Sequence, residues 1–152
     1  MHTINIIHAE KKHKDFILHA NDVINNVNDT EQTNGLRENI DKDYFCDNPK
    51  FKCLIAEIDG NPVGMILYSY FYWANDGEVL WISQMFIEEE YRNKGIFIKL
   101  IKKLREENKD IKIVSCATGD ENIRMQKILR GYKAHEINLK FYYKKILKNI
   151  KY

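Results

Sequence analysis

The pattern of hydrophobic and polar positions changes character in the middle of the chain. Residues 79–87 form an apolar run rich in branched and aromatic side chains, which predicts a buried strand. After a short acidic and polar link, apolar residues recur at helical spacing from Ile96 to Leu104, with basic residues between them. A strand, a tight turn and a helix therefore meet at residues 92–95, and the rest of the chain is organised around this junction.

Periodicity and turn residues predict an ordered series of elements on both sides of the junction. The expected strands cover residues 3–8, 51–58, 63–73, 79–87, 111–117, 132–136 and 138–146. The expected helices cover residues 10–28, 36–45, 96–104 and 121–129. Turns at 59–61 and 74–77 join neighbouring strands, and Gly131-Tyr132 is expected to end the last helix.

The junction at residues 92–95 has the physical features of a phosphate cradle. A helix start presents unpaired backbone N–H groups and the positive end of the helix dipole. Gly95 lets a ligand approach the backbone, while Arg92 and Lys94 add positive charge. Taken alone, the turn is as consistent with an exposed basic loop that binds nothing, so the flanking residues must decide.

The longer stretch from Met85 to Ile96 closely resembles the acetyl-CoA signature of the GCN5-related N-acetyltransferases, the GNAT superfamily. The resemblance runs without a gap through strand, turn and helix start. One position departs: Phe97 stands where the pattern has Gly or Ala, and we expect its side chain to crowd the pyrophosphate. The resemblance implies a single α/β (α+β) domain over residues 1–152, with a mixed central sheet of about six to seven strands flanked by about four helices.

The resemblance also implies how acetyl-CoA binds as the acyl donor. Backbone groups of Met85 and Ile87 would hold the pantetheine arm and polarise the thioester carbonyl. The turn from Arg92 to Phe97 would hold the pyrophosphate. The expected cofactor-binding residues are Met85, Phe86, Ile87, Arg92, Asn93, Lys94, Gly95, Ile96, Phe97 and Asn122.

Two further family positions, an Asn after the next strand and a Tyr before the closing glycine, are ambiguous here. Counting back from Gly131 without gaps places Asp120 at the Asn position and Lys127 at the Tyr position. A two-residue deletion makes Asn122 the match instead. Neither register supplies the tyrosine.

A narrower resemblance covers residues 43–104 and points to the diamine and polyamine acetyltransferases. It rests on residues 44–57, on Val63-Gly64, and on the aromatic-rich strand at 68–73. The aromatic residues have an alternative interpretation as core. The resemblance implies a small amine as the acceptor.

The acid–base chemistry is where the sequence departs from that branch. An alkylammonium with a pKa near 10.4 is only about 0.04% neutral at pH 7, so forming the reactive neutral amine costs roughly 4.6 kcal/mol of free energy. A base or water relay and an acid for the leaving thiolate are therefore needed. An acidic pair sits on the strand before the cofactor turn in the diamine branch, whereas this chain has neutral Ser83 and Gln84 there.

Other residues can be named for these roles. Ser83 and Gln84 can position a water, Glu88 can act through water, and Tyr132 can protonate the thiolate. The catalytic candidates are accordingly Ser83, Gln84, Glu88 and Tyr132. Further candidates are Glu78, Tyr142, Tyr143, Cys116 and the neighbouring pair His135 and Glu136.

Composition narrows the classes of protein. The 152 residues carry a formal net charge of +2, which gives no bulk electrostatic argument for nucleic-acid binding. No apolar run reaches membrane-spanning length, and the N-terminus does not begin a secretory signal. The three cysteines form no C-x-x-C pair and are expected to be reduced thiols in the cytoplasm. The five histidines show no zinc spacing, so no metal is expected.

These observations lead to an acetyl-CoA-dependent N-acetyltransferase acting on a primary amine, with a small amine as first choice. One alternative acceptor is a protein or aminoacyl-tRNA amine, which only the basic tail at 144–152 supports. Another alternative is a catalytically weakened acyl-CoA-binding interaction protein, favoured by the neutral Ser83-Gln84 pair, the missing tyrosine and Phe97. The resemblance also makes a homodimer an expectation.

Overall fold

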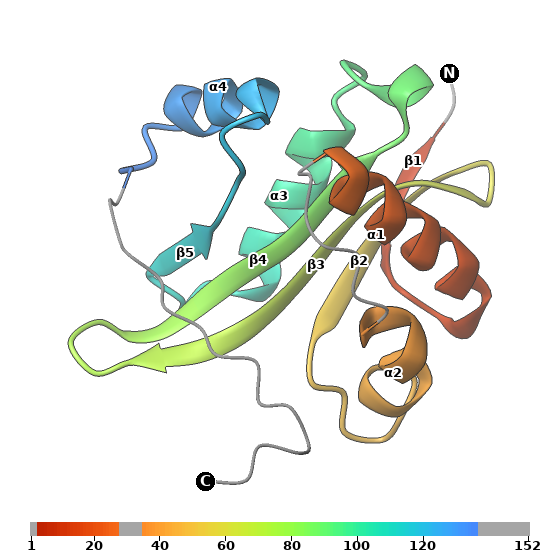
Figure 1. Cartoon of the computed structure of the whole chain (residues 1–152), viewed down its shortest axis with the longest axis horizontal. Coiled ribbons are helices and arrows are strands. Elements are labelled where there is room, and N and C mark those ends of the chain that lie inside the picture. The colour runs from red at the N-terminus through yellow and green to blue at the C-terminus, as the bar shows by residue number, and fades with distance from the viewer. Residues whose placement is uncertain (1–2, 28–34, 137–152) are drawn as a thin grey trace, which may run out of the picture. The chain divides into compact units, whose positions relative to one another are not determined.

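The computed structural model describes residues 3–27 and 35–136, which contain one mixed β-sheet (Figure 1). Its strands, in spatial order, are β1 (Ile4–His8), β2 (Lys52–Ile58), β3 (Asn61–Trp73), β4 (Gly77–Ile87) and β5 (Ile113–Cys116). Strands β1 to β4 are antiparallel neighbours, and β5 lies parallel to β4. The expected mixed sheet is confirmed, with five strands among the described residues in place of six or seven.

The described residues also form four α-helices and two short 3₁₀ turns. In chain order they are η1 (Lys11–His13), α1 (Lys14–Val27), α2 (Gly35–Asp43), η2 (Glu89–Tyr91), α3 (Ile96–Glu107) and α4 (Ile123–Gly131). The chain divides into two compact units, one that ends at Asn122 and one that begins at Ile123. The sheet and α1 to α3 belong to the first unit, and α4 belongs to the second.

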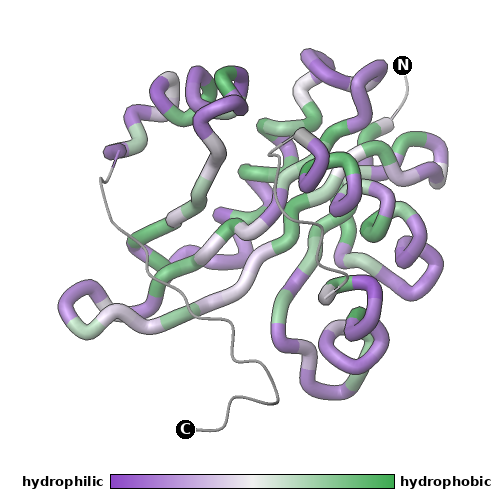
Figure 2. Tube along the Cα trace, viewed as in Figure 1, coloured by the Kyte–Doolittle hydropathy of each residue, from purple (hydrophilic) through white to green (hydrophobic). Residues whose placement is uncertain are grey.

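Helices of the first unit cover both faces of its sheet, and apolar residues fill the two layers between them (Figures 1 and 2). One core joins α3 to the sheet through Ile96, Leu100 and Leu104, the stripe predicted from helical spacing. The opposite core joins α1 and α2 to the sheet through residues such as Ile17 and Ile40. Figure 2 shows the hydrophobic residues gathered along the strands and the inner helix surfaces.

A bulge in β4 changes which side chains face which helices. Leu67 of β3 pairs with Gln84, and Tyr68 pairs with Ile82, so Ser83 is an extra residue with no partner on β3. Before the bulge the even-numbered residues of β4 face the α3 core, and after it the odd-numbered residues do. Gln84 therefore faces α1, and the strand bends at Ser83.

The turn between β2 and β3 follows from two residues with positive φ. Asp59 has φ 51° and Gly60 has φ 79°, the conformation of a tight hairpin turn. The predicted turn at 59–61 is confirmed, except that Asn61 already pairs with Ile58 as the first residue of β3.

The first predicted closing strand, at residues 132–136, is wrong. The N–H of Lys133 donates to Arg130 O at 2.9 Å, and the N–H of Ala134 donates to Leu129 O at 3.1 Å. Lys133 has φ 57°, so these bonds form a Schellman end to α4, with Lys133 in the left-handed position in place of Gly131. The amides needed for a strand are used by the helix end. The second closing strand, at 138–146, lies outside the described residues.

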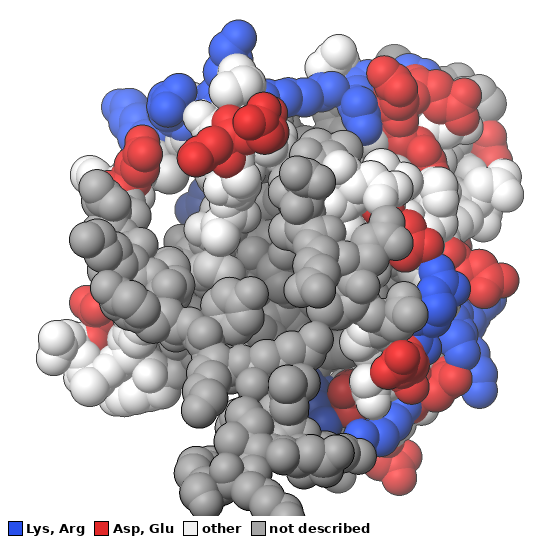
Figure 3. Space-filling model, viewed as in Figure 1, with Lys and Arg blue, Asp and Glu red and all other residues white. Residues whose placement is uncertain are grey.

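Charges of both signs lie side by side over α1 and α2 (Figure 3). Lys14 Nζ lies 2.5 Å from Asp41 Oδ2, and Arg37 Nη2 lies 2.7 Å from Asp22 Oδ2. These pairs balance the surface of the two helices locally. Within residues 3–27 and 35–136, no helix combines the length and the apolar content that crossing a membrane requires.

Candidate active site

The junction predicted at residues 92–95 is built as a strand, a turn and a helix. Strand β4 ends at Ile87, η2 follows, and α3 begins at Ile96. Asn93 and Gly95 both have positive φ, 63° and 77° respectively. A Cβ placed on Gly95 would meet no atom within 4 Å, so the space beside the helix start is open. The backbone of the turn can therefore be approached closely by a ligand.

Arg92 fixes this turn to the end of β4. Its Nε donates to the carbonyl oxygen of Ile87 at 3.1 Å, and its Nη1 lies 3.9 Å from Glu89 Oε1. Its backbone N–H donates to Glu89 O at 3.2 Å. Arg92 thus stabilises the turn from within, and its contact with a pyrophosphate stays a prediction.

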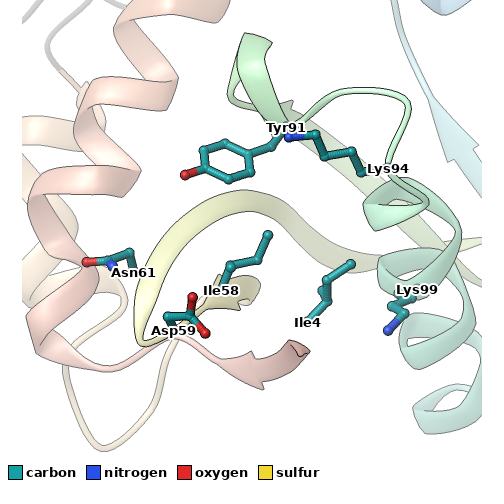
Figure 4. A pocket seen from close by; sticks show the side chains of 7 residues that line it. All are labelled: Ile4, Ile58, Asp59, Asn61, Tyr91, Lys94 and Lys99. Carbon is teal, nitrogen blue, oxygen red and sulfur yellow. The ribbon is translucent and has the colours of Figure 1, made fainter. Parts of the chain in front are cut away.

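Lys94 lies next to a pocket, beside Tyr91 (Figure 4). Its Nζ lies 5.0 Å from the centre of the Tyr91 ring, a cation–π distance. The pocket has a volume of about 690 Å³ and is lined by Ile4, Ile58, Asp59, Asn61, Tyr91, Lys94 and Lys99. The ammonium of Lys94 thus lies toward β1 and β2, while β5 borders the other edge of β4.

β4 and β5 separate where the bulge begins. Their parallel pairing runs from Val79–Ile113 to Ile82–Cys116 and stops there. Over Gln84–Ile87, β4 pairs with β3 on one side, and no described strand pairs with its other edge. Arg92 Nε already binds the carbonyl oxygen of Ile87, so the backbone N–H groups of Met85 and Ile87 are the groups that this edge offers to a bound molecule. This open edge leads directly to the turn at Gly95.

The bulge carries neutral hydrogen-bonding groups. Ser83 Oγ donates to Leu67 O at 3.1 Å. Gln84 Nε2 donates to Asn21 Oδ1 on α1 at 2.5 Å. Gln84 Oε1 is buried and accepts no hydrogen bond within the described part of the chain. An orphaned buried acceptor costs about 1–3 kcal/mol, so a bound N–H or water that reached it would be stabilised.

The candidate bases lie in different places. Glu88 Oε1 lies 3.2 Å from His19 Nε2, so its carboxylate faces α1 at the end of β4. Glu78 lies opposite Tyr72 near the tip of the β3–β4 hairpin, five residues or roughly 16 Å along the strand from Ser83. Glu88 is therefore brought to the α1 side of the site, and Glu78 is not.

Among the remaining candidates, Cys116 ends the parallel pairing of β5. Burial raises the pKa of the Cys116 thiol, which lowers its thiolate content and its nucleophilicity. The backbone N–H of Asn122 donates to Gly119 O at 3.0 Å in the turn before α4.

The remaining catalytic candidates belong to the second unit, which begins at Ile123. Tyr132 follows α4, and its side chain is 56% exposed. His135 and Glu136 also follow α4 and are exposed, and Glu136 Oε2 lies 4.0 Å from Arg130 Nη2. Tyr142 and Tyr143 lie outside the described residues.

Sequence reasoning missed two residues of α1, Asn21 and His19. Asn21 is only 8% exposed on a helix face whose neighbours are apolar, such as Ile17. A polar residue inside an apolar stripe was the available signal, because buried amides need partners. His19 had no such signal, since it lies on the exposed side of the same helix and contacts the Phe86 ring edge-on at 5.9 Å.

Together these features define an α/β domain with a glycine turn at a helix start beside an open strand edge. Residues 21–132, which are more than half of the chain, match the Acetyltransferase (GNAT) family. The chain belongs to this family.

Relatives and solved structures agree with the assignment. A thialysine N-epsilon-acetyltransferase from Sus scrofa is 35% identical over 85 residues, which are 51% of this chain and 50% of that protein. A spermidine/spermine N(1)-acetyltransferase-like protein 1 from Homo sapiens is 33% identical over 70 residues, 41% of this chain and 10% of that protein. The chain therefore spans half or less of the length of these relatives. The aminoglycoside N-acetyltransferase AAC(6')-Iy in complex with CoA shares the fold with a TM-score of 0.73 and 18% identity, over 95% of this chain and 96% of that one.

The residues present are compatible with a bound CoA. Gly95 leaves room for a phosphate at the start of α3, and beyond Ser83 one edge of β4 pairs with no described strand. Phe97, the second residue of α3, is half-buried at this point. Within the described ranges, no group of three or more His, Cys, Asp or Glu side chains is arranged to hold a metal ion.

Proposed function

We propose that this protein transfers an acetyl group from acetyl-CoA to the primary amine of a small molecule. The observation that carries the proposal is the open edge of β4 at 83–87, which leads into the left-handed glycine turn at the start of α3. Membership of the GNAT family supports the reaction class. The similar proteins named for thialysine and for spermidine/spermine support a small amine as acceptor.

The donor would lie with its pyrophosphate at the first turn of α3 and its thioester beside the open edge of β4. Gly95 permits the close approach of the phosphates, and the helix start supplies N–H groups and dipole charge. Backbone N–H groups of Met85 or Ile87 would donate to the thioester oxygen, which gains negative charge as the amine attacks. The N–C bond forms and the C–S bond breaks in this addition and elimination.

Because Ser83 and Gln84 at the bulge are neutral, the proton transfers of the reaction would have to use other groups. Gln84 Oε1 would accept an N–H of the incoming amine, and Ser83 would help to hold a water. The amine would react in its neutral form, and water would take the proton that it loses. Glu88, whose carboxylate lies 3.2 Å from His19 Nε2, is the alternative acceptor of that proton. Tyr132 would supply a proton to the leaving thiolate. All of these roles are proposals.

A second candidate function is acyl-CoA binding without efficient catalysis. The neutral Ser83 and Gln84, in contact with Leu67 O and Asn21, favour it because no carboxylate lies at the bulge.

We further propose that residues 1–152 form one domain, because the family match crosses the boundary between the two units. We also propose a cytoplasmic protein that forms homodimers.

Thiol release from acetyl-CoA with a panel of amines tests the proposed function. The panel contains a thialysine-like amine, spermidine, an arylalkylamine and an aminoglycoside. Amine-dependent release that saturates with at least one amine of the panel is expected. Tight acetyl-CoA binding without amine-dependent release would favour the binding protein, and absence of binding would exclude both.

A further inference from the structure

One face of the β3–β4 hairpin carries three aromatic rings, of which the Phe71 ring contacts the other two. The centroids of Phe71 and Trp81 lie 6.2 Å apart, and those of Phe71 and Trp73 lie 5.6 Å apart, with the rings steeply inclined in both pairs. Phe71 and Trp81 are half-buried, and Trp73 is 36% exposed. We call these three residues the aromatic cluster.

Strand alternation places the aromatic cluster on the same face as the neutral groups of the bulge. Tyr68 and Tyr70 of β3 and Leu80 of β4 face the α3 core, so Phe71 and Trp81 face the other way. Gln84 faces that side too, because it contacts Asn21 on α1.

The aromatic cluster also begins close to the open edge. Trp81 lies opposite Ser69 and two residues before Ser83, about 7 Å along the strand. Phe71 pairs with Val79 and Trp73 with Gly77, so these two residues continue the cluster toward the hairpin tip. Figure 1 shows the long β3–β4 ribbon that ends in this tip. A molecule with one end at Ser83 would therefore rest its other end on the rings.

Strands β3 and β4 contribute no carboxylate to this face, and Glu88, just beyond the end of β4 on the α1 side, is paired with His19 at 3.2 Å. Strands β3 and β4 contain one carboxylate, Glu78, and its partner in the register is Tyr72 on the opposite face. Aromatic rings attract flat apolar groups through offset or edge-to-face packing. We therefore expect this face to favour an aromatic acceptor over an extended polyamine.

We propose that the acceptor is a primary amine whose non-reacting part is an aromatic or flat apolar group, bound by Trp81 and Phe71 with Trp73 at the outer edge. This inference rests on the proposed function and names its substrate class. The ring of the acceptor packs on the cluster, and its amine reaches Ser83 and Gln84. The amine nitrogen forms the new bond to the acetyl carbon, the C–S bond breaks, and the amine proton passes through water to the thiolate.

Acceptor kinetics of matched variants test this inference. The arylalkylamine phenethylamine is compared with spermidine in wild type and in Trp81→Leu, Phe71→Leu and Trp81→Phe. We expect kcat/KM at least about tenfold higher for phenethylamine, and a rise of about tenfold in its KM in the two leucine variants. KM for acetyl-CoA should stay constant, and Trp81→Phe should retain most of the phenethylamine activity.

Tyr72→Leu is the matched control. Tyr72 is 75% exposed on the opposite face of the same strand, so its removal should not change either KM. Equal effects of Tyr72→Leu and Trp81→Leu, or no preference for phenethylamine, would overturn the inference while leaving the acetyltransferase activity intact.

Phenethylamine binding, measured by calorimetry in the presence of CoA, tests the inference without relying on turnover. Trp81-dependent binding without turnover would support the inference and contradict the proposed function, and Trp81-independent binding would overturn the inference.

Discussion

The side-chain nitrogen of Gln84 donates to Asn21 Oδ1 at 2.5 Å and joins the middle of β4 to helix α1. Both groups are neutral amides, and Gln84 Oε1 stays buried without a partner in the described part of the chain. The acceptor side of the proposed site thus offers hydrogen bonds rather than negative charge. Because of this contact, we expect a polyamine to be a poor substrate.

Installing an acidic pair at the bulge should change the preferred substrate. We expect Ser83→Glu with Gln84→Asp to raise kcat/KM for spermidine, because two carboxylates bind a diammonium that two neutral groups do not. The same charge should leave phenethylamine turnover unchanged or lower it. Initial rates with both amines, in both forms of the enzyme, check this.

The pH dependence of the wild type distinguishes the source of the base. Without a carboxylate at the bulge, kcat/KM for an alkylamine should rise with pH toward the amine's own pKa near 10.4. A plateau that begins near pH 7 would contradict this and would identify an internal base, with Glu88 beside His19 as the first residue to mutate.

Gly95→Asp should abolish acetyl-CoA binding. Gly95 has φ 77°, and an Asp there places a carboxylate against the pyrophosphate. Gly77→Asp is the control, because Gly77 has φ 87° and bears the same backbone strain in the hairpin turn. Calorimetry should show at least a thirtyfold loss of affinity for acetyl-CoA in Gly95→Asp, about 2 kcal/mol of binding free energy, and little change in Gly77→Asp. Unchanged affinity in a folded Gly95→Asp variant would falsify the assignment of the turn.

Phe97→Gly should tighten acetyl-CoA binding, because a side chain is removed where the phosphates approach α3. Glycine destabilises a helix by up to about 1 kcal/mol, so the neighbouring Ile98→Gly serves as control for that cost. Ile98 is 62% exposed on the same turn of the helix. Weaker binding by Phe97→Gly alone would show that the ring packs as part of the site.

Glu57 should make stability depend on pH in the acid range. A hydrogen bond from His13 Nε2 at 2.8 Å and then the Lys12 ammonium at 3.0 Å lower the pKa of the Glu57 carboxyl. Because the pKa of Glu57 is lower in the folded state than its ordinary value of 4.5, ionised Glu57 stabilises the folded protein at pH values above 4.5. This stabilisation is lost as the pH falls below that value.

Urea unfolding of the wild type and Glu57→Gln between pH 3 and 7 checks this prediction. We expect the variant to be less stable at pH 7 and the difference to shrink as pH falls. Parallel curves for the two proteins would show that Glu57 contributes no proton linkage.

Much of the first unit could be predicted because its signals are local. The apolar stripe of Ile96, Leu100 and Leu104 defined α3, and Asp59-Gly60 defined the hairpin turn. The bulge at Ser83 could not be predicted, since it depends on how β3 and β4 register against each other. The contact between Asn21 and Gln84 spans 63 positions and depends on the same register. The strand at 132–136 was mispredicted because Lys133 adopts the left-handed conformation usually left to glycine.

The most direct test of the central claim is mass spectrometry of the amine after reaction with acetyl-CoA, with free CoA measured in the same sample. We expect N-acetylated amine and CoA in equal amounts with the wild type, and neither with Gly95→Asp. CoA released without acetylated amine, or acetyl-CoA bound with no product from any amine in the panel, would contradict it.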